Sequence, residues 1–415
     1  MTVYINHRTQ QWPVGHGFLH TASLKPDEGA EGGVRTYRYV YDCGSVARTL
    51  VEERIDQYFA NEELERREPE LDMLVLSHFH IDHINGLPHL LSRFKVSKLV
   101  LPFLSEDFTL AALADLAASG LDAWNEYSGL VLDPQRWMGA RGQGDVQITR
   151  VQPANPDDLD RPEDPNGQDP RPNNVSGGDI ALPRGAISDK VNGTIGATGH
   201  EFWDFRFYAH ENWERYLSLL SALEVAFAPP TEADLLAWLS DPTWIAANHA
   251  TVTDVFRSLG SPNQNGITLC MYSGPRLGRR VQGILRWPSH EQAMLSHVND
   301  FGYRWRFRTV GWLGTGDAEL HDAPLFDAFA AHYRGYTDAV HTITIPHHGS
   351  IENYCGALGE IGHCAVLTSD HEDDPNGHHP NSLVMVNLKT KSGPAFIVTR
   401  EMNSAAFSTA EIVVD

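Results

Sequence analysis

The sequence has little cysteine. Its 415 residues include only Cys43, Cys270, Cys355 and Cys364, and no two of them form a C-x-x-C pair. This argues against a disulfide scaffold and against a cysteine-bound zinc site, and it favours a reducing, cytoplasmic setting. The sequence also has no charge-free apolar run long enough to span a bilayer and no signal-like apolar start, so we expect no membrane segment and no export.

Basic residues are scarce as well. The chain has 32 lysines and arginines against 54 acidic residues, a net charge of −22. Such a charge repels nucleic acid at long range and weakens the case for a nuclease. It does not exclude one, because bound divalent cations supply positive charge where a phosphate would sit. Histidine, by contrast, is abundant, with 21 residues.

Hydrophobic patterning predicts an α/β protein with two strand-rich parts. Strands are expected at 37–41, 71–76 and 98–101, helices at 46–67 and 87–94, and strands again from 267 onward. A chain of this length is too long for one simple core. We therefore divide it into a first half, 1–102, an insertion, 103–262, and a second half, 263–415. The insertion combines helices with a Pro/Asp-rich stretch at 151–179, which we expect to be a surface loop.

Four side chains that can bind metal follow the predicted strand at 71–76 within six residues: His78, His80, Asp82 and His83. His78 and His80 can point at one ion, while Asp82 and His83 can reach a second. Nitrogen and carboxylate ligands suit zinc, with manganese or iron as alternatives. Two such ions would activate a bridging hydroxide at neutral pH.

Further candidate ligands follow later strands. Asp317 ends a Gly-Thr-Gly-Asp turn after 310–313, and His347 and His348 follow a strand at 342–345. A turn aspartate and two surface histidines are the simpler interpretations, but a strand end favours ligation. His379 lies in a polar loop after 365–367, and for it both interpretations stay open.

These motifs together resemble the metallo-β-lactamase superfamily. They are Asp42-Cys43-Gly44, the His-x-His-x-Asp-His of 78–83, the Thr-Gly-Asp of 315–317 and the final histidines. Over roughly 1–100 and 263–415, the chain is similar to the branch that contains the competence DNA-uptake nuclease domain and phosphocholine esterases, through Val14-Gly15-His16-Gly17, Pro346-His347-His348-Gly349-Ser350 and His379-Pro380. The resemblance implies an αββα sandwich carrying a large helical and loop insertion.

The resemblance also implies a role for each residue. His78 and His80 would bind one ion, Asp82 and His83 the other, with Asp317 bridging and His348 completing the second site. Asp42 would orient the cluster from beneath, although a plain turn aspartate explains it equally well. Asp82 would also act as a base, His379 as a transition-state or proton donor, and His347 in substrate binding or support.

One ligand common in the superfamily has no clear counterpart in this chain. It is a histidine in a Gly-His turn between the first cluster and the bridging aspartate. His210, His249 and His290 are candidates by position only, and each has a simpler interpretation as a surface or structural histidine. The first ion would then keep an open water position.

We expect hydrolysis of a phosphodiester, such as a nucleic acid, by a metal-bridging hydroxide. Arg304, Arg306 and Arg308 alternate with aromatic residues, so they share one strand face that either binds phosphates or is simply solvated. The alternatives are a hydrolase of small esters, lactones or thioesters, and a metal-binding regulatory protein without turnover. The fold does not choose between them, and the sequence identifies no protein partner.

Overall fold

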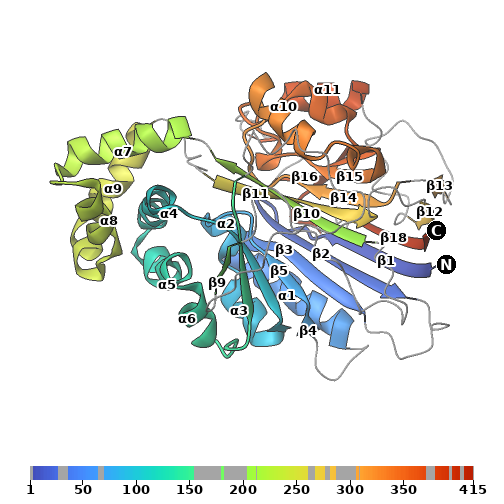
Figure 1. Cartoon of the computed structure of the whole chain (residues 1–415), viewed down its shortest axis with the longest axis horizontal. Coiled ribbons are helices and arrows are strands. Elements are labelled where there is room, and N and C mark those ends of the chain that lie inside the picture. Colours follow the sequence, from blue (N-terminus) through green and yellow to red (C-terminus); the bar gives the residue numbers. More distant parts are fainter. Residues whose placement is uncertain are drawn as a thin grey trace.

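The computed structural model describes most of the chain, namely residues 3–26, 36–63, 70–153, 179–181, 203–211, 213–259, 267–275, 281–286, 305–307, 309–370, 379–391, 395–401 and 406–414. Two β-sheets lie face to face, and helices cover the outer face of each (Figure 1). The structure therefore confirms the expected αββα sandwich.

In the described part of the chain, the first sheet has ten strands in the order β13-β12-β18-β1-β2-β3-β5-β7-β8-β9. The strands from β3 to β9 run parallel, and those from β13 to β3 pair antiparallel. Their bounds are β1 (Val3–Gln11), β2 (Gly17–Pro26), β3 (Tyr37–Ser45), β5 (Met73–Val75), β7 (Lys98–Pro102), β8 (Gln147–Val151), β9 (Asp179–Ala181), β12 (Val281–Arg286), β13 (Trp305–Phe307) and β18 (Ala406–Val414).

The second sheet has six described strands in the order β10-β11-β14-β15-β16-β17. The strands β14 to β17 run parallel, whereas β10, β11 and β14 pair antiparallel. Their bounds are β10 (Trp203–Glu211), β11 (Ile267–Pro275), β14 (Gly311–Gly314), β15 (Val340–Thr344), β16 (Cys364–Thr368) and β17 (Ala395–Val398). A small separate pair consists of β4 (Glu70–Leu71) and β6 (Lys95–Val96).

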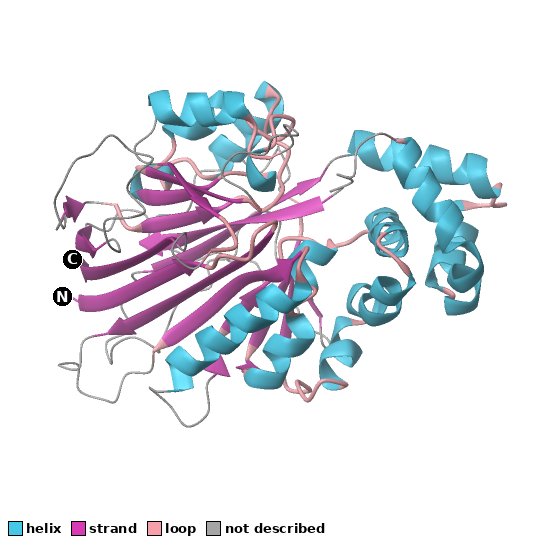
Figure 2. Cartoon of the chain, turned by 180° about the vertical axis from the view of Figure 1, so that it is seen from behind, coloured by secondary structure: helices cyan, strands magenta, loops and turns pink. Residues whose placement is uncertain are grey.

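The helices fall into three groups. On the first sheet lie α1 (Arg48–Glu63), α2 (Ile81–Ile84) and α3 (Leu87–Arg93), and on the second lie α10 (Ala323–His332) and α11 (Ser382–Lys391) (Figure 2). Beside the sandwich stand α4 (Glu106–Ala118), α5 (Leu121–Leu132), α6 (Pro134–Gly139), α7 (Trp213–Phe227), α8 (Glu232–Ser240) and α9 (Pro242–Ser258). Short 3-10 helices span Thr337–Ala339, His347–Gly349 and Gly356–Glu360. No helix in the described ranges is long and apolar enough to cross a membrane.

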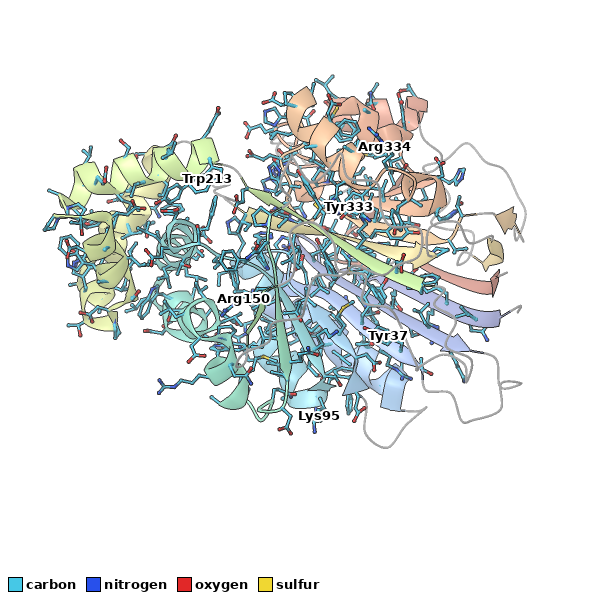
Figure 3. The ribbon with its side chains drawn as sticks, viewed as in Figure 1. Tyr37, Lys95, Arg150, Trp213, Tyr333 and Arg334 are labelled. Atoms are coloured by element: carbon cyan, nitrogen blue, oxygen red, sulfur yellow. The ribbon has the colours of Figure 1, made fainter. Side chains whose placement is uncertain are left out.

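Alternation of side chains along the strands builds the layers. In β3, Tyr39 and Tyr41 face the second sheet while Val40 packs toward the helices, because successive side chains point to opposite faces. A third cluster, which includes Tyr333, fills the space between the second sheet and its helices (Figure 3). In the parallel strands β3, β5, β7, β14, β15 and β16, nearly all successive side chains are therefore buried, as expected for parallel strands covered on both sides.

The middle segment, 103–262, contains more than helices and a loop. Its strands β8 and β9 belong to the first sheet, and β10 belongs to the second. The sequence analysis did not predict these strands, and the proposed division at residues 102 and 262 stays a prediction. Helix α8 in this segment begins with a cap at Thr231, whose side chain accepts a hydrogen bond from the Asp234 amide. Most of the proline-rich stretch, 154–178, lies outside the described residues.

Two histidines are buried between the sheets. His20 stacks on Trp312 with ring centroids 4.1 Å apart, and neither of its ring nitrogens has a hydrogen-bond partner among the described residues. His7 packs edge-on against Trp203 at 4.7 Å. Burial lowers the pKa of His7 to about 3 and holds the pKa of His20 well below its ordinary value.

This burial predicts acid sensitivity. The unfolded chain binds a proton at each histidine below pH 6.5, whereas the folded protein does so only near the lowered pKa, so stability is full above pH 6.5 and falls as pH decreases. The His20→Phe variant keeps a stacked ring and loses the titration. Its free energy of unfolding, measured with urea between pH 7.5 and 4.5, should depend on pH less steeply, by up to about 1.4 kcal/mol per pH unit. The exposed His321→Phe variant serves as control, and a slope unchanged by His20→Phe contradicts the prediction.

Candidate metal centre

The predicted ligands meet where strands of both sheets end. His78 follows β5 of the first sheet, whereas Asp317, His348 and His379 follow β14, β15 and β16 of the second. The carboxyl ends of parallel strands share one edge of a sheet, which is where α/β proteins place their sites. Two sheets packed face to face thus bring residues far apart in the sequence to one place.

Carboxylates and imidazoles in this cluster face one another at separations longer than those of ordinary hydrogen bonds. The separations are 3.6 Å from His78 Nε2 to Asp317 Oδ2, 3.5 Å from His83 Nε2 to Asp317 Oδ1, 3.7 Å from His83 Nε2 to Asp82 Oδ2, and 3.4 Å from His348 Nε2 to Asp82 Oδ2. Two ligands about 2.1 Å from one tetrahedral ion are about 3.4 Å apart. The spacing is therefore that of metal ligands.

The Nε2 atoms of His78, His83 and His348 support this fit. All three are buried and have no hydrogen-bond partner among the described residues. A buried polar atom without a partner costs free energy, unless a bound ion or ligand satisfies it. Imidazole nitrogens beside carboxylates are suitable donors for zinc or manganese. The residues present therefore fit a divalent metal centre.

The other ring nitrogen of each of these histidines, Nδ1, contacts a polar side chain. His83 Nδ1 lies 2.8 Å from Asp42 Oδ2, His78 Nδ1 lies 2.8 Å from Ser77 Oγ, and His348 Nδ1 lies 2.9 Å from Thr368 Oγ1. Such contacts fix the orientation of a ring and leave Nε2 for the metal. The resemblance implied that Asp42 orients the cluster from beneath, with a plain turn aspartate as the alternative; in the structure Asp42 is fully buried and contacts His83 and Ser77.

Asp42 also supports the turn that carries the motif. Its carboxylate accepts hydrogen bonds from the Ser77 amide at 2.7 Å and from the Ser77 hydroxyl at 2.6 Å. The backbones are packed closely here. A Cβ at Gly44 would lie 2.5 Å from the Asp82 carbonyl carbon, so only glycine fits. His347 and His348 are in the left-handed region, with φ of 49° and 54°, a strain that residues other than glycine adopt mainly at functional sites.

The charges in the cluster depend on one another. Burial alone would lower the pKa of His83, but Asp317, Asp82 and Asp42 outweigh it and raise this pKa to about 10. Burial opposes ionisation of Asp82 and Asp317, yet nearby histidines, His83 foremost, hold both carboxyl pKa values below the ordinary range. The site thus concentrates ionised carboxylates in a buried place, which is the electrostatic requirement of a cation site.

The structure adds a histidine that sequence analysis did not propose as a ligand. His16 forms a group with Asp82 and His348, in which one potential ligand atom from each residue lies within 4.8 Å of the others. A second such group is His78, His83 and Asp317. This grouping differs from the implied one, in which His80 joins His78 and Asp82 joins His83.

The loop that contains His16 is anchored from the second sheet. The His16 amide donates a hydrogen bond of 2.6 Å to Asp370, which also accepts two hydrogen bonds from Arg400. The His16 ring lies 3.9 Å from the ring of His348. Burial, with His348 next in effect, lowers the pKa of His16 to about 3, so its ring is neutral and can donate a lone pair. In the sequence, the position of His16 in the Val14-Gly15-His16-Gly17 motif was the feature that could have identified it as a candidate ligand.

Two further predicted residues lie beside the cluster. His347 Nε2 is 4.0 Å from Asp317 Oδ2, and its Nδ1 is 2.9 Å from Asn353 Oδ1. The ring of His379 lies 5.0 Å from that of His347, and His379 is half-buried. Both imidazoles therefore lie next to the candidate ligands, with His379 closer to solvent.

The other predicted residues either lie outside the described residues or are not in the ligand groups found among them. Arg304 and Arg308 lie outside the described residues, as does His290. The side chain of Arg306 is also not described, and its strand, β13, is six spacings along the sheet from β5, roughly 29 Å at about 4.8 Å per strand (Figure 1). His210 is in β10 and His249 in α9, and neither belongs to the ligand groups found among the described residues.

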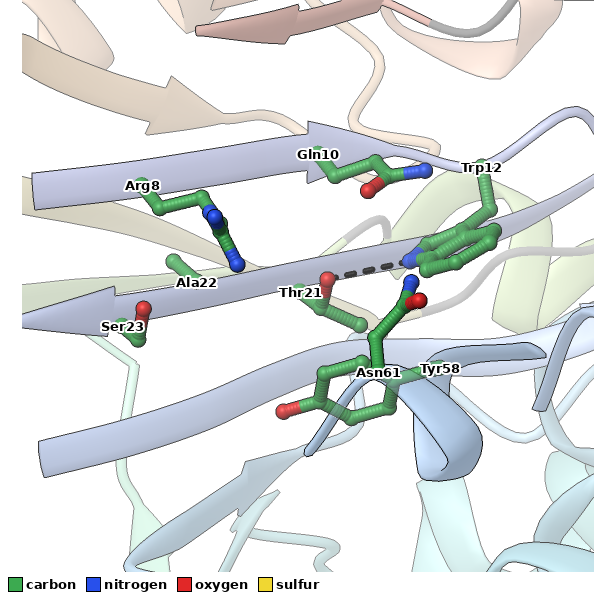
Figure 4. Close-up of a pocket in the computed structure, with 8 residues that line it drawn as sticks. All are labelled: Arg8, Gln10, Trp12, Thr21, Ala22, Ser23, Tyr58 and Asn61. Carbon is green, nitrogen blue, oxygen red and sulfur yellow. Dashed lines mark hydrogen bonds between the residues drawn. The ribbon is translucent and has the colours of Figure 1, made fainter. Parts of the chain in front are cut away.

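A separate pocket lies on the helix-covered face of the first sheet (Figure 4). There Trp12 donates a hydrogen bond of 3.0 Å to Thr21. The pocket is lined by Arg8, Gln10, Trp12, Thr21, Ala22, Ser23, Tyr58 and Asn61. These side chains include no histidine, cysteine or carboxylate, so the pocket is not a second metal centre.

Comparison with known families agrees with the site. Residues 34–227 match the family model of the metallo-beta-lactamase superfamily. This stretch contains Asp42 and the cluster from His78 to His83, whereas Asp317 and His348 lie outside it and reach the cluster through the fold. No curated protein sequence matches the chain. The match, the αββα fold and the ligand geometry together support a metal-dependent hydrolase.

Metal binding should stabilise the protein. Zinc at a hundredfold excess over its Kd adds about 2.7 kcal/mol to the free energy of unfolding, which raises the melting temperature of chelator-treated protein by several degrees. The Asp317→Asn variant, which loses a charge facing two histidines, should show a smaller rise. The Asp254→Asn variant, changed at an exposed position of α9, should respond like the wild type. A melting temperature that zinc leaves unchanged contradicts the metal centre.

Proposed function

We propose that the protein is a two-metal phosphodiesterase, with nucleic acids among its candidate substrates. The observation that carries the proposal is the position of Asp317, whose two oxygens face different histidines, His78 at 3.6 Å and His83 at 3.5 Å. A carboxylate with ligands on both sides is suited to bridging two ions. Paired ions serve phosphodiester hydrolysis, because they stabilise both the attacking and the leaving oxygen. The sequence resemblance to a branch of nucleases and phosphocholine esterases adds support.

The proposed ligands are the six residues His78, His80, Asp82, His83, Asp317 and His348, with zinc favoured and manganese as the alternative. When bound, the ions would activate a water nucleophile and neutralise charge on the substrate. Asp82 faces His83 and His348, and as a carboxylate it can also accept a proton from the nucleophile.

His379 is the proposed proton donor to the leaving group. It is more exposed than His347, whose Nδ1 is held by Asn353. An imidazole beside the centre, outside the ligand groups of the described residues and partly exposed, can exchange protons with solvent. His347, between His379 and Asp317, is proposed to hold the substrate phosphate by a hydrogen bond.

Hydrolysis of a small ester, lactone or thioester is the second candidate. The net charge of −22 favours it, because the whole molecule repels a polyanion. A metal-binding regulatory protein without turnover is the weaker alternative, since the described cluster keeps every ligand of the 78–83 motif together with Asp317 and His348.

Turnover assays separate these functions. Zinc- or manganese-loaded protein should hydrolyse bis-p-nitrophenyl phosphate and a nucleic acid. In the Asp82→Asn and Asp317→Asn variants, kcat/KM should fall by at least about 100-fold, because each substitution removes a charged proposed ligand. Asp254→Asn is the matched aspartate control. Fast cleavage of carboxylic esters or lactones with poor phosphodiester turnover identifies the second candidate. Activity that survives both site substitutions rules out the two-metal mechanism.

A further inference from the structure

We propose that Asp115, on helix α4, is a direct ligand of the ion held by His78 and His80. It would occupy the coordination position for which the described residues supply no histidine. The inference rests on the two-metal centre of the proposed function, and it gives the helices beside the sandwich a part in the site. Sequence analysis left that position to water.

Asp115 is unusual for its surroundings. All of α4 is described, and its buried side chains are Phe108, Leu110, Ala111, Leu113, Ala114, Asp115, Leu116 and Ala117. Asp115 is the one charged residue in that set. An ionisable side chain is expected in such a place only if a partner compensates for its burial.

Among the described residues, the Asp115 carboxylate faces His80 and also feels the charge of Asp82. Its Oδ2 lies 3.4 Å from His80 Nε2, and the two side chains are 13% and 15% exposed. That separation is too long for a good hydrogen bond, and it equals the 3.4 Å between His348 and Asp82 in the metal centre. The geometry is that of two ligands on one ion.

His80 lies next to the candidate metal centre. Its ring lies 4.7 Å from the ring of His78, whose Nε2 faces Asp317. Burial raises the pKa of Asp115, and the charge of Asp82 adds to this while His80 opposes it. A divalent ion between Asp115, His80 and His78 would offset the cost of burying the carboxylate. It would also make His80 a metal ligand, although His80 belongs to neither of the two ligand groups described above.

The position of α4 is fixed by its neighbours, so Asp115 is held in place. The helix begins with a cap, in which Ser105 accepts a hydrogen bond from the Phe108 amide, and it packs against α5, α7, α8 and α9. In α5, Tyr127 donates a hydrogen bond of 3.1 Å to the Asn85 carbonyl, next to the metal motif. The helical group is thus joined to Asn85, the residue that follows α2 and the metal motif.

Zinc titration of the full-length, metal-free protein tests the proposal. Calorimetry and elemental analysis should give two ions per chain for the wild type. In Asp115→Ala the Kd of one ion should rise at least tenfold while the other stays unchanged, and Asp115→His should restore tight binding of both. Glu106→Ala, at an exposed position in the first turn of the same helix, is the control. The absorption spectrum of the cobalt-loaded protein should change in Asp115→Ala and Asp115→His.

Stability of the metal-free protein separates ligation from a structural role. Removing an uncompensated buried carboxylate should leave the melting temperature of metal-free Asp115→Ala equal to or above that of the wild type. The isosteric Asp115→Asn should show the same weakened zinc binding, which keeps the test decisive if the alanine variant does not fold. Two ions bound with unchanged Kd in both variants overturns the proposal. A wild type that binds two ions but hydrolyses no phosphodiester refutes the proposed function while leaving this assignment intact.

Discussion

The attraction between buried carboxylates and the imidazoles that face them determines how this site is built. Asp82 and Asp317 are ionised in a place that excludes most water, and their histidine partners stand at ligand spacing rather than hydrogen-bond spacing. Without a cation, such a cluster is expensive to bury. Asp42 makes the arrangement possible, because it holds His83 and Ser77 from behind and so directs the ring toward the centre.

The sandwich supplies the two halves of the centre from opposite sheets. β5 delivers the motif that begins at His78, while β14 and β15 deliver Asp317 and His348. The aromatic core between the sheets, with Tyr41 and Trp312 in contact, sets their relative position. The chemistry therefore depends on long-range packing, and a substitution that shifts one sheet against the other would separate ligands without touching any of them.

Much of this was visible in the sequence, and the remainder has physical reasons. The positions of the 78–83 motif and of the later candidate residues at strand ends were predictable, because side chains of ligand type stood directly after buried apolar runs. His16 was not predicted as a ligand because one histidine in a glycine turn has many simpler explanations. Asp115 was not predicted because an aspartate in a helix is usually exposed to solvent, and only the structure shows that α4 is buried on nearly every side. The strands β8 to β10 were missed because a proline-rich stretch and helical segments surround them.

The central claim is that the two sheets together hold two ions. The most direct test is a crystal structure of the zinc-loaded protein with anomalous diffraction at the zinc edge. Two bound ions should give two anomalous peaks about 3.5–4 Å apart on either side of Asp317, one beside His78 and His80 and the other beside Asp82 and His348. A single peak, or zinc bound away from Asp317, would contradict it.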